Sequence, residues 1–328
     1  MKVLFIGGTG TISTAVTRLA VSNGIELYHL NRGKRDSSVN GVQTLIADIH
    51  DPQSLHSALE NQHFDVVVDW IAFTPEDIER DLNLFRGKVR QFIFISSASV
   101  YQKPPTSHVI TESTPLHNPY WQYSRSKIAC EDRLIQAYRQ EGFPVTIVRP
   151  SHTYDHNLPV AVSGAGPYTL ADRMKRGLPV IVHGDGSSLW VLTHSEDFAK
   201  GFMGLVGNMQ AIGHSFQITS DEVLNWNQIY QIIADELGVQ ANIVHIASEF
   251  INQLSPDIGA GLIGDKAWSV IFDNRKIKSF VPDYQAVIPF REGIRRALAW
   301  FDEDESRRVV NEASNQEMDR IIAAYQSR

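Results

Sequence analysis

The 328-residue sequence contains little cysteine: Cys130 is the single one. One thiol excludes an intrachain disulfide framework and a metal cluster held by several thiolates, and it suits a reducing compartment. Long apolar runs are missing too, since none approaches the roughly 20 residues that a helix needs to span a bilayer. The apolar opening of residues 1–8 ends quickly in glycine, so we interpret it as a buried strand. We expect a soluble, cytoplasmic protein without a membrane partner.

An excess of basic charge is also absent. The chain has 30 Lys and Arg residues against 37 Asp and Glu residues, a formal net charge of −7. This balance disfavours bulk attraction to nucleic acid or anionic lipid. His152 and His156 stand four residues apart in an expected loop, where histidines usually bind substrate or water rather than metal. We therefore expect neither a nucleic-acid partner nor a metal.

Short apolar runs alternate with amphipathic stretches in the first half of the chain, the pattern of βαβ units on a parallel sheet. Nearly continuous apolar runs such as Val66–Trp70 are typical of strands covered on both faces. The pattern predicts an α/β fold with a doubly wound parallel sheet of the Rossmann type. The expected strands are residues 3–6, 26–30, 44–47, 66–70, 91–95 and 145–148, and the expected helices are residues 11–22, 53–61, 75–85 and 120–140.

The pattern loosens after Arg149-Pro150. We expect a first domain over residues 1–150 and a smaller, mixed α/β domain over residues 151–328, with some segments returning to the first lobe. The residues from Glu303 onward are strongly charged and predict a terminal helix with little apolar surface to bury.

A glycine-rich turn, Gly7-Gly8-Thr9-Gly10, follows the first expected strand and opens the first expected helix. Glycines allow a tight turn and a close approach to a pyrophosphate, and the helix N-terminus supplies N–H donors. Ser13 stands at the third glycine position of the fingerprint and is small enough to keep helix and strand close. The turn predicts a dinucleotide site.

A carboxylate is missing at the end of the second strand, where NAD-specific proteins usually hold the ribose 2′-hydroxyl. Asn31 follows this strand, and Arg32, Lys34 and Arg35 come after it. Arg32 and Arg35 have the geometry to clamp a 2′-phosphate, because guanidinium pairs its donors with phosphate oxygens. We expect NADP in preference to NAD, although backbone groups can also hold an adenine ribose.

Tyr123 and Lys127 stand four residues apart on one face of an expected helix, and Ser97 follows the fifth expected strand. An ammonium and an oxidised nicotinamide both lower the pKa of a nearby phenol. Tyr123 would then exchange a proton with a carbinol while hydride moves to or from the cofactor. Ser97 would hold the reacting oxygen, and Lys127 would also hold the nicotinamide ribose.

Taken in order, the glycine turn, the serine-bearing strand, Tyr123-x-x-x-Lys127 and Arg149-Pro150 resemble the short-chain dehydrogenase/reductase superfamily. The chain is most similar to its extended type, the NAD-dependent epimerase/dehydratase family of nucleotide-sugar enzymes. The resemblance runs from Met1 to about Phe301. It implies an NAD(P)-binding first domain, a substrate-binding second domain, and a homodimer formed through two helices, one of them carrying Tyr123 and Lys127.

The resemblance also assigns residues. It makes Ser97, Tyr123 and Lys127 the catalytic trio, with Lys127 also on the cofactor. The cofactor contacts that it implies are Gly7, Gly10, Thr11 and Ile12 on the pyrophosphate, Asp48 and Ile49 near adenine, and Ala72 from the fourth strand.

Three departures from the family pattern bear on the substrate. Ala98 and Ser99 stand where 4,6-dehydratases carry an Asp-Glu pair, so we do not expect a 4,6-dehydratase. Trp190 replaces the arginine for the substrate diphosphate, a charge-assisted contact of about 1.5–3 kcal/mol. His152 replaces an amide that contacts substrate. With these departures the chain resembles an atypical branch of the family, the bacterial relatives of the chloroplast stem-loop-binding proteins. The candidate substrate contacts are Ser99, Tyr101, His152 and Trp190.

The leading hypothesis is an NAD(P)-dependent oxidoreductase or epimerase acting on a secondary alcohol or ketone, on a small molecule such as a sugar or nucleotide sugar. The alternative is a non-redox NAD(P)-binding scaffold or an RNA-interacting protein, which the altered substrate motifs suggest. Reductase and epimerase both stay open at this point, as does the identity of the substrate.

Overall fold

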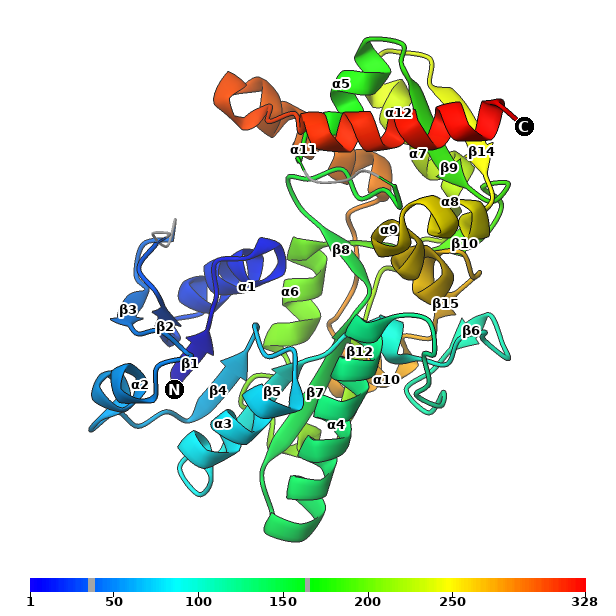
Figure 1. Cartoon of the computed structure of the whole chain (residues 1–328). Coiled ribbons are helices and arrows are strands. Elements are labelled where there is room, and N and C mark those ends of the chain that lie inside the picture. Colours follow the sequence, from blue (N-terminus) through cyan, green and yellow to red (C-terminus); the bar gives the residue numbers. More distant parts are fainter. Residues whose placement is uncertain (35–38, 163–165) are drawn as a thin grey trace.

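The computed structural model describes residues 1–34, 39–162 and 166–328 (Figure 1). Its central sheet has seven parallel strands in the order β12-β7-β5-β4-β1-β2-β3. The order reverses direction between β1 and β4, and ligands bind at such switch points, beyond the carboxyl ends of the strands. The predicted Rossmann architecture is confirmed. The strands are β1 Lys2–Ile6, β2 Glu26–Asn31, β3 Gln43–Ile46, β4 Val66–Asp69, β5 Gln91–Ile95, β7 Val145–Pro150 and β12 Ser215–Ile218.

Helices cover both faces of this sheet. On one face α1 (Thr11–Ser22) and α6 (Ser195–Met203) share a core with Val3, Phe5 and Val66. On the other face lie α2 (Pro52–Leu59), α3 (Pro75–Phe85) and α4 (Gln122–Glu141). Val66 to Val68 are at most 1% exposed, which is why this strand is a continuous apolar run. No helix within the described ranges is long and apolar enough to cross a membrane.

The second lobe is assembled from short strand pairs and helices, the mixed α/β architecture that was predicted. In it β9 pairs with β14 and β8 with β11, both in parallel, while β10 and β13 run antiparallel. β6 (Val109–Ile110) pairs with β15 (Ile271–Phe272) in parallel beside it. The further strands are β8 His152–Tyr154, β9 Pro179–His183, β10 Leu189–Trp190, β11 Leu192–His194, β13 Leu224–Asn225 and β14 Asn242–Ile246, and the helices are α5 Thr169–Lys175, α7 Trp226–Glu236, α8 Ser248–Leu254, α9 Pro256–Gly261, α10 Arg275–Phe280, α11 Phe290–Asp302 and α12 Glu312–Gln326.

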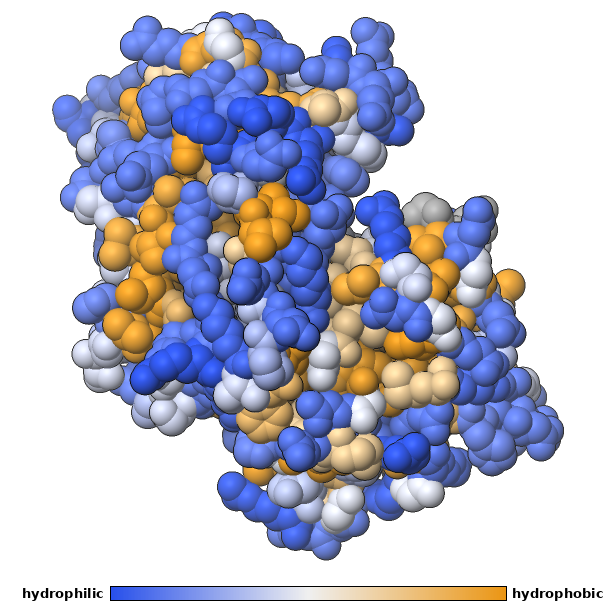
Figure 2. All heavy atoms as spheres, turned by 180° about the vertical axis from the view of Figure 1, so that it is seen from behind, coloured by the Kyte–Doolittle hydropathy of each residue, from blue (hydrophilic) through white to orange (hydrophobic). Residues whose placement is uncertain are grey.

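The chain returns to the first lobe after residue 150. Strand β12 extends the central sheet beside β7, and α6 packs beside α1 on one face of this sheet. Segments after residue 150 therefore complete the first lobe. The domain boundary at residue 150 stays a prediction. Seen from behind, the surface is indented between the second lobe and the part of the first lobe that carries β2 and β3 (Figure 2).

A C-terminal helix is present as predicted, but the expectation that it has little apolar surface to bury was wrong. Helix α12 lies across the second lobe (Figure 1) and buries Met318, Ile321 and Ile322 against β9, β14 and α8. These three residues are at most 4% exposed. They stand at positions i, i+3 and i+4, so they lie on one face of the helix. The prediction missed this apolar face because the rest of the helix is strongly charged.

Candidate active site

A cavity of about 600 Å³ lies at the carboxyl ends of β1 to β4, at the switch point of the sheet. Four predicted cofactor segments meet there, because parallel strands end at one edge. Of the predicted cofactor residues it is lined by Gly7, Asn31, Arg32, Asp48 and Ile49. Arg35 lies outside the described residues.

The remaining predicted cofactor residues lie around this cavity rather than in its lining. Gly10, Thr11 and Ile12 open helix α1 directly after the turn. Ser13 accepts a hydrogen bond from the Gly10 N–H at 2.9 Å, so the serine at the third fingerprint position stabilises the turn. Ala72 is fully buried, and its carbonyl rather than its side chain faces Lys127.

The glycine turn requires glycine for two separate reasons. Gly7 and Gly8 have φ of +93° and +103°, a region that L side chains rarely adopt. A Cβ on Gly8 would also lie 2.7–2.9 Å from ring atoms of His29. That ring cannot move aside easily, because it is buried, stacks on Phe5 and is held by Thr17 at 3.1 Å. The turn is therefore fixed by both backbone and packing.

We expect Gly8→Ala to destabilise the protein more than Gly24→Ala does. Both positions have positive φ, which costs roughly 1–2 kcal/mol for a residue with a Cβ. A Cβ on Gly24 meets no atom within 4 Å, whereas one on Gly8 meets His29. Thermal denaturation midpoints of the two variants measure the difference. Equal midpoints would contradict the packing argument.

Two kinds of cation line the cavity at the glycine turn. Arg80 is ion-paired to Asp69, Asp77 and Asp81 at 2.9–3.1 Å, so its charge is compensated. Burial, with Asp69 nearby, raises the pKa of Asp81 well above its usual range. Arg32 and Lys34 form no ion pair with another described residue and are exposed at the cavity rim.

Asn31 offers a further test of whether a dinucleotide fits. Its Oδ1 accepts the Gly33 N–H at 2.8 Å, while its Nδ2 is a buried donor without a partner among the described residues. A buried donor without an acceptor is costly unless a ligand supplies one. The end of β2 thus offers the unpaired amide of Asn31 and the cations of Arg32 and Lys34, and it carries no carboxylate. These donors fit a ribose or a phosphate, whose oxygens accept hydrogen bonds.

The structure brings the three predicted catalytic residues together. Ser97 follows β5, and Tyr123 and Lys127 lie in the first two turns of α4. A hydrogen bond between Tyr123 and Ser97 lowers the phenol pKa, but burial raises it more, so the net pKa of Tyr123 is raised. The phenol is therefore protonated at neutral pH in the free protein, the form that donates a proton to a ketone oxygen.

Lys127 is anchored on the sheet. Its ammonium donates to the carbonyls of Ala72 at 2.6 Å and Ile95 at 2.8 Å, and it lies 5.9 Å from the centre of the Tyr123 ring. Burial lowers its pKa to about 8. An ammonium has three donors, so one remains for a ligand at the edge of β4 and β5.

Three of the four candidate substrate residues are buried. Ser99, Tyr101 and Trp190 are 2%, 0% and 1% exposed. The Ser99 hydroxyl accepts a hydrogen bond from the Ser124 hydroxyl at 2.8 Å and lies 3.0 Å from the Ser97 hydroxyl. Ser99 therefore helps to hold the Ser97 side chain in place. A ligand at this site would therefore meet the neighbours of these three side chains rather than the side chains themselves.

His152 is the fourth candidate and remains partly exposed. Its Nδ1 lies 3.3 Å from the indole Nε1 of Trp190, and an indole N–H can only donate. Nδ1 is therefore the acceptor, and Nε2 carries the proton. Burial lowers the pKa of His152 to about 3, so the ring is neutral and presents an N–H donor.

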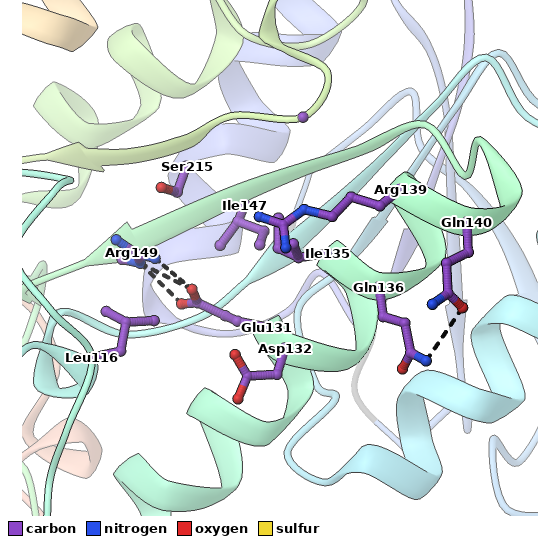
Figure 3. A pocket seen from close by; sticks show the side chains of 11 residues that line it. Leu116, Glu131, Asp132, Ile135, Gln136, Arg139, Gln140, Ile147, Arg149 and Ser215 are labelled. Carbon is purple, nitrogen blue, oxygen red and sulfur yellow. Dashed lines mark hydrogen bonds and ion pairs between the residues drawn. The ribbon is translucent and has the colours of Figure 1, made fainter.

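Sequence reasoning missed Glu131, one turn beyond Lys127. Glu131 and Arg149 line a second cavity of about 340 Å³ between α4 and the strands β7 and β12 (Figure 3). Arg149 pairs with both carboxylate oxygens, at 2.5–3.2 Å, and the Ser96 hydroxyl donates to the same carboxylate at 2.5 Å. The pair ties the end of β5 to α4 and β7. The i+4 spacing from Lys127 was the available signal.

The doubly wound sheet and the convergence at its switch point define a Rossmann-type protein. The chain belongs to the NAD dependent epimerase/dehydratase family, which residues 3–219 match. The predicted family resemblance is therefore confirmed.

Two curated relatives and one solved structure illustrate the similarity. The chain is 23% identical over 286 residues to 2'-dehydrokanamycin reductase of Streptomyces kanamyceticus, covering 87% of this chain and 80% of that protein. It is 26% identical over 263 residues to the chloroplast stem-loop binding protein of 41 kDa b of Arabidopsis thaliana, covering 74% and 65%. UDP-glucuronic acid 4-epimerase from Bacillus cereus, solved with UDP-glucuronic acid and NAD, has a TM-score of 0.75 at 16% identity, covering 92% and 99%.

Proposed function

We propose that the protein is an NAD(P)-dependent reductase or epimerase that acts on a secondary alcohol or ketone of a sugar-like substrate. The observation that carries this proposal is the convergence of Ser97, Tyr123 and Lys127 beside the cavity at the glycine turn. The names of the relatives, a dehydrokanamycin reductase and a UDP-glucuronic acid epimerase, support a sugar-like substrate.

The chain's own residues divide the work of such a reaction. When bound, a nicotinamide dinucleotide supplies or accepts hydride. Tyr123 holds the proton that a ketone oxygen gains or a carbinol loses. Ser97, which hydrogen-bonds to the phenol in the free protein, would donate its hydroxyl proton to that oxygen and so position it. Lys127, fixed by two carbonyls, holds a cationic donor where the edge of the sheet meets the cavity. This fixed positive charge favours the phenolate in the oxidative direction.

Hydride transfer tests the proposal directly. The purified chain is mixed with NADPH or NADH and a panel of keto sugars, or with the oxidised cofactors and sugars, and absorbance at the nicotinamide band is followed. We expect turnover with at least one sugar in one direction. Tight cofactor binding without hydride transfer to any member would favour the non-redox scaffold instead.

We also propose NADP in preference to NAD, on the basis of Asn31, Arg32 and Lys34 at the cavity. Asn31→Asp is expected to raise the KM for NADPH at least about tenfold and to leave the KM for NADH equal or lower. A carboxylate repels a 2′-phosphate and accepts from a 2′-hydroxyl. Asn31→Ala is the matched control, since it removes the amide without adding charge. An unchanged ratio of KM values in Asn31→Asp would contradict the preference.

Two further points stay proposals. A 4,6-dehydratase is disfavoured because Ala98 and Ser99, at 5% and 2% exposure, supply no acid–base pair after the catalytic serine. A homodimer through two helices, one of them α4, follows from the family resemblance, and size-exclusion chromatography with light scattering tests it.

The RNA-interacting alternative has a separate test. Many arginines in the described part of the second lobe are already ion-paired on the surface, among them Arg291, Arg296 and Arg320. Binding that depends on phosphate contacts falls steeply with added salt. Salt-sensitive RNA binding at low ionic strength would support this alternative, and its absence would remove it.

A further inference from the structure

A π-helical turn, Leu262–Lys266, brings charge from the second lobe to the neighbourhood of Tyr123. Its Gly264 packs against Trp121, whose ring centre lies 4.9 Å from that of Tyr123. The carboxylate of Asp265 is close enough to contribute to the raised phenol pKa. π-helical turns inside helices occur frequently at functional sites.

Both lobes hold this turn in place. Asn118 donates to the carbonyls of Ser99 at 2.8 Å and Gly264 at 2.6 Å, which links the turn to the catalytic strand end. The carbonyl of Lys266 accepts from Trp226 at 3.1 Å and lies 2.9 Å from a ring nitrogen of His183. The backbone of the turn is therefore fixed, and its side chains are preorganised before a ligand arrives.

The charges on the turn do not balance. The carboxylate of Asp265 lies 3.5 Å from the ammonium of Lys103 and 3.8 Å from that of Lys266. Lys103 is 2% exposed, so it needs the carboxylate as its counter-ion. The side chain of Lys266 is 19% exposed. With two ammonium groups and one carboxylate in this cluster, Lys266 carries the surplus positive charge.

Lys266 faces the proposed reaction centre across a single indole. Its ammonium lies 5.4 Å from the centre of the Trp121 ring, and that ring contacts Tyr123. His152 lies beside the same turn, because its ring centre is 6.3 Å from that of Trp226, whose indole N–H donates to the carbonyl of Lys266 at 3.1 Å. Burial lowers the pKa of the His152 imidazole, and the charge of Lys266 lowers it further. Lys266 and the Nε2–H of His152 are both donors, and one is charged, which suits an anionic acceptor.

We propose that Lys266 and His152 bind an anionic group on the sugar itself, a carboxylate or a phosphate, close to the carbon that reacts. This inference rests on the proposed function and narrows its substrate class to acidic sugars. Neutral sugars would leave the two ammonium groups of Lys103 and Lys266 sharing the single carboxylate of Asp265. Amino sugars would add a second positive charge beside it, which costs binding free energy.

The experiment measures binding and turnover with four probes: D-glucuronate, D-glucose 6-phosphate, D-glucose and D-glucosamine. The full chain is loaded with NADP, and quenching of its tryptophan fluorescence gives dissociation constants without any need for turnover. We expect one or both acidic probes to bind at least about tenfold more tightly than D-glucose, as one charge-assisted contact requires. Preference between the first two probes distinguishes carboxylate from phosphate.

Lys266→Gln identifies the residue responsible. It should weaken the acidic probe at least about tenfold and leave D-glucose and NADP unchanged, since the hydrogen bonds that fix the turn use the backbone carbonyl. Lys88→Gln, in the exposed turn after α3, is the matched control. Equal binding of all four probes, binding of none, or an unaffected acidic probe in Lys266→Gln would overturn the inference. Selective acidic binding without hydride transfer would instead overturn only the proposed function.

Discussion

Replacing Tyr123 by Phe is expected to lower kcat by about 10²–10⁴-fold, the contribution of a positioned proton donor. The substitution removes one oxygen from a ring that packs against Phe73 and Trp121, so the packing is retained. Cofactor binding should be unchanged, because Tyr123 does not line the cavity at the glycine turn. Stopped-flow absorbance of the nicotinamide and fluorescence titration of the cofactor measure the two effects separately.

Tyr120→Phe supplies the matched control for this prediction. Tyr120 lies just before α4, three residues from Tyr123, and is 41% exposed. Its replacement by Phe should leave kcat within about twofold, since surface substitutions rarely disturb a folded site. Turnover that survived in Tyr123→Phe would refute the proton-transfer role, and an equal loss in both variants would indicate damage to the helix instead.

The part of the site that depends on strand ends could be predicted from the sequence. Gly7, Asn31, Asp48 and Ser97 each follow a strand that local patterns already indicate, and parallel strands deliver their carboxyl ends to one edge. Lys127 was also assigned correctly to the helix that covers this edge. Local periodicity and the rule for parallel sheets were sufficient for these residues.

The charged network behind the cavity could not be predicted in the same way. Asp69 ends β4 within a run that was recognised, but its partner Arg80 comes from α3 and is shared with Asp77 and Asp81. Which of several carboxylates faces a guanidinium depends on helix rotation. The sequence indicates how a helix is rotated only through the position of its apolar face, which is too coarse to select one carboxylate among several.

Contacts between the two lobes were even harder to predict from the sequence. Asn118 and Gly264 are 146 residues apart, and Lys103 and Asp265 are separated by a similar distance along the chain. No local pattern connects them, and a π-helical turn has no periodicity that a short window detects. The acidic-sugar hypothesis therefore depends on the three-dimensional arrangement alone.

Breaking the ion pair between Glu131 and Arg149 is expected to give the largest loss of stability. The two side chains are 2% and 6% exposed, so removing one partner leaves a buried charge without compensation. Such a change typically costs about 3–5 kcal/mol of unfolding free energy. Glu131→Leu should cost this much, and it also removes the acceptor of the Ser96 hydroxyl. Denaturant unfolding followed by circular dichroism measures the cost.

A double substitution separates the cost of an unpaired charge from the value of the pair. Glu131→Leu with Arg149→Met replaces both charges by apolar groups of similar size, and such replacements of buried pairs are often neutral or stabilising. We therefore expect the double variant to be more stable than either single one. Arg291→Met, which removes surface pairs with Asp235 and Glu236, should lower the unfolding free energy far less than Glu131→Leu does and serves as the control. Additive losses in the double variant would mean that Glu131 and Arg149 stabilise the fold independently, and the link between β5, α4 and β7 would then require another explanation.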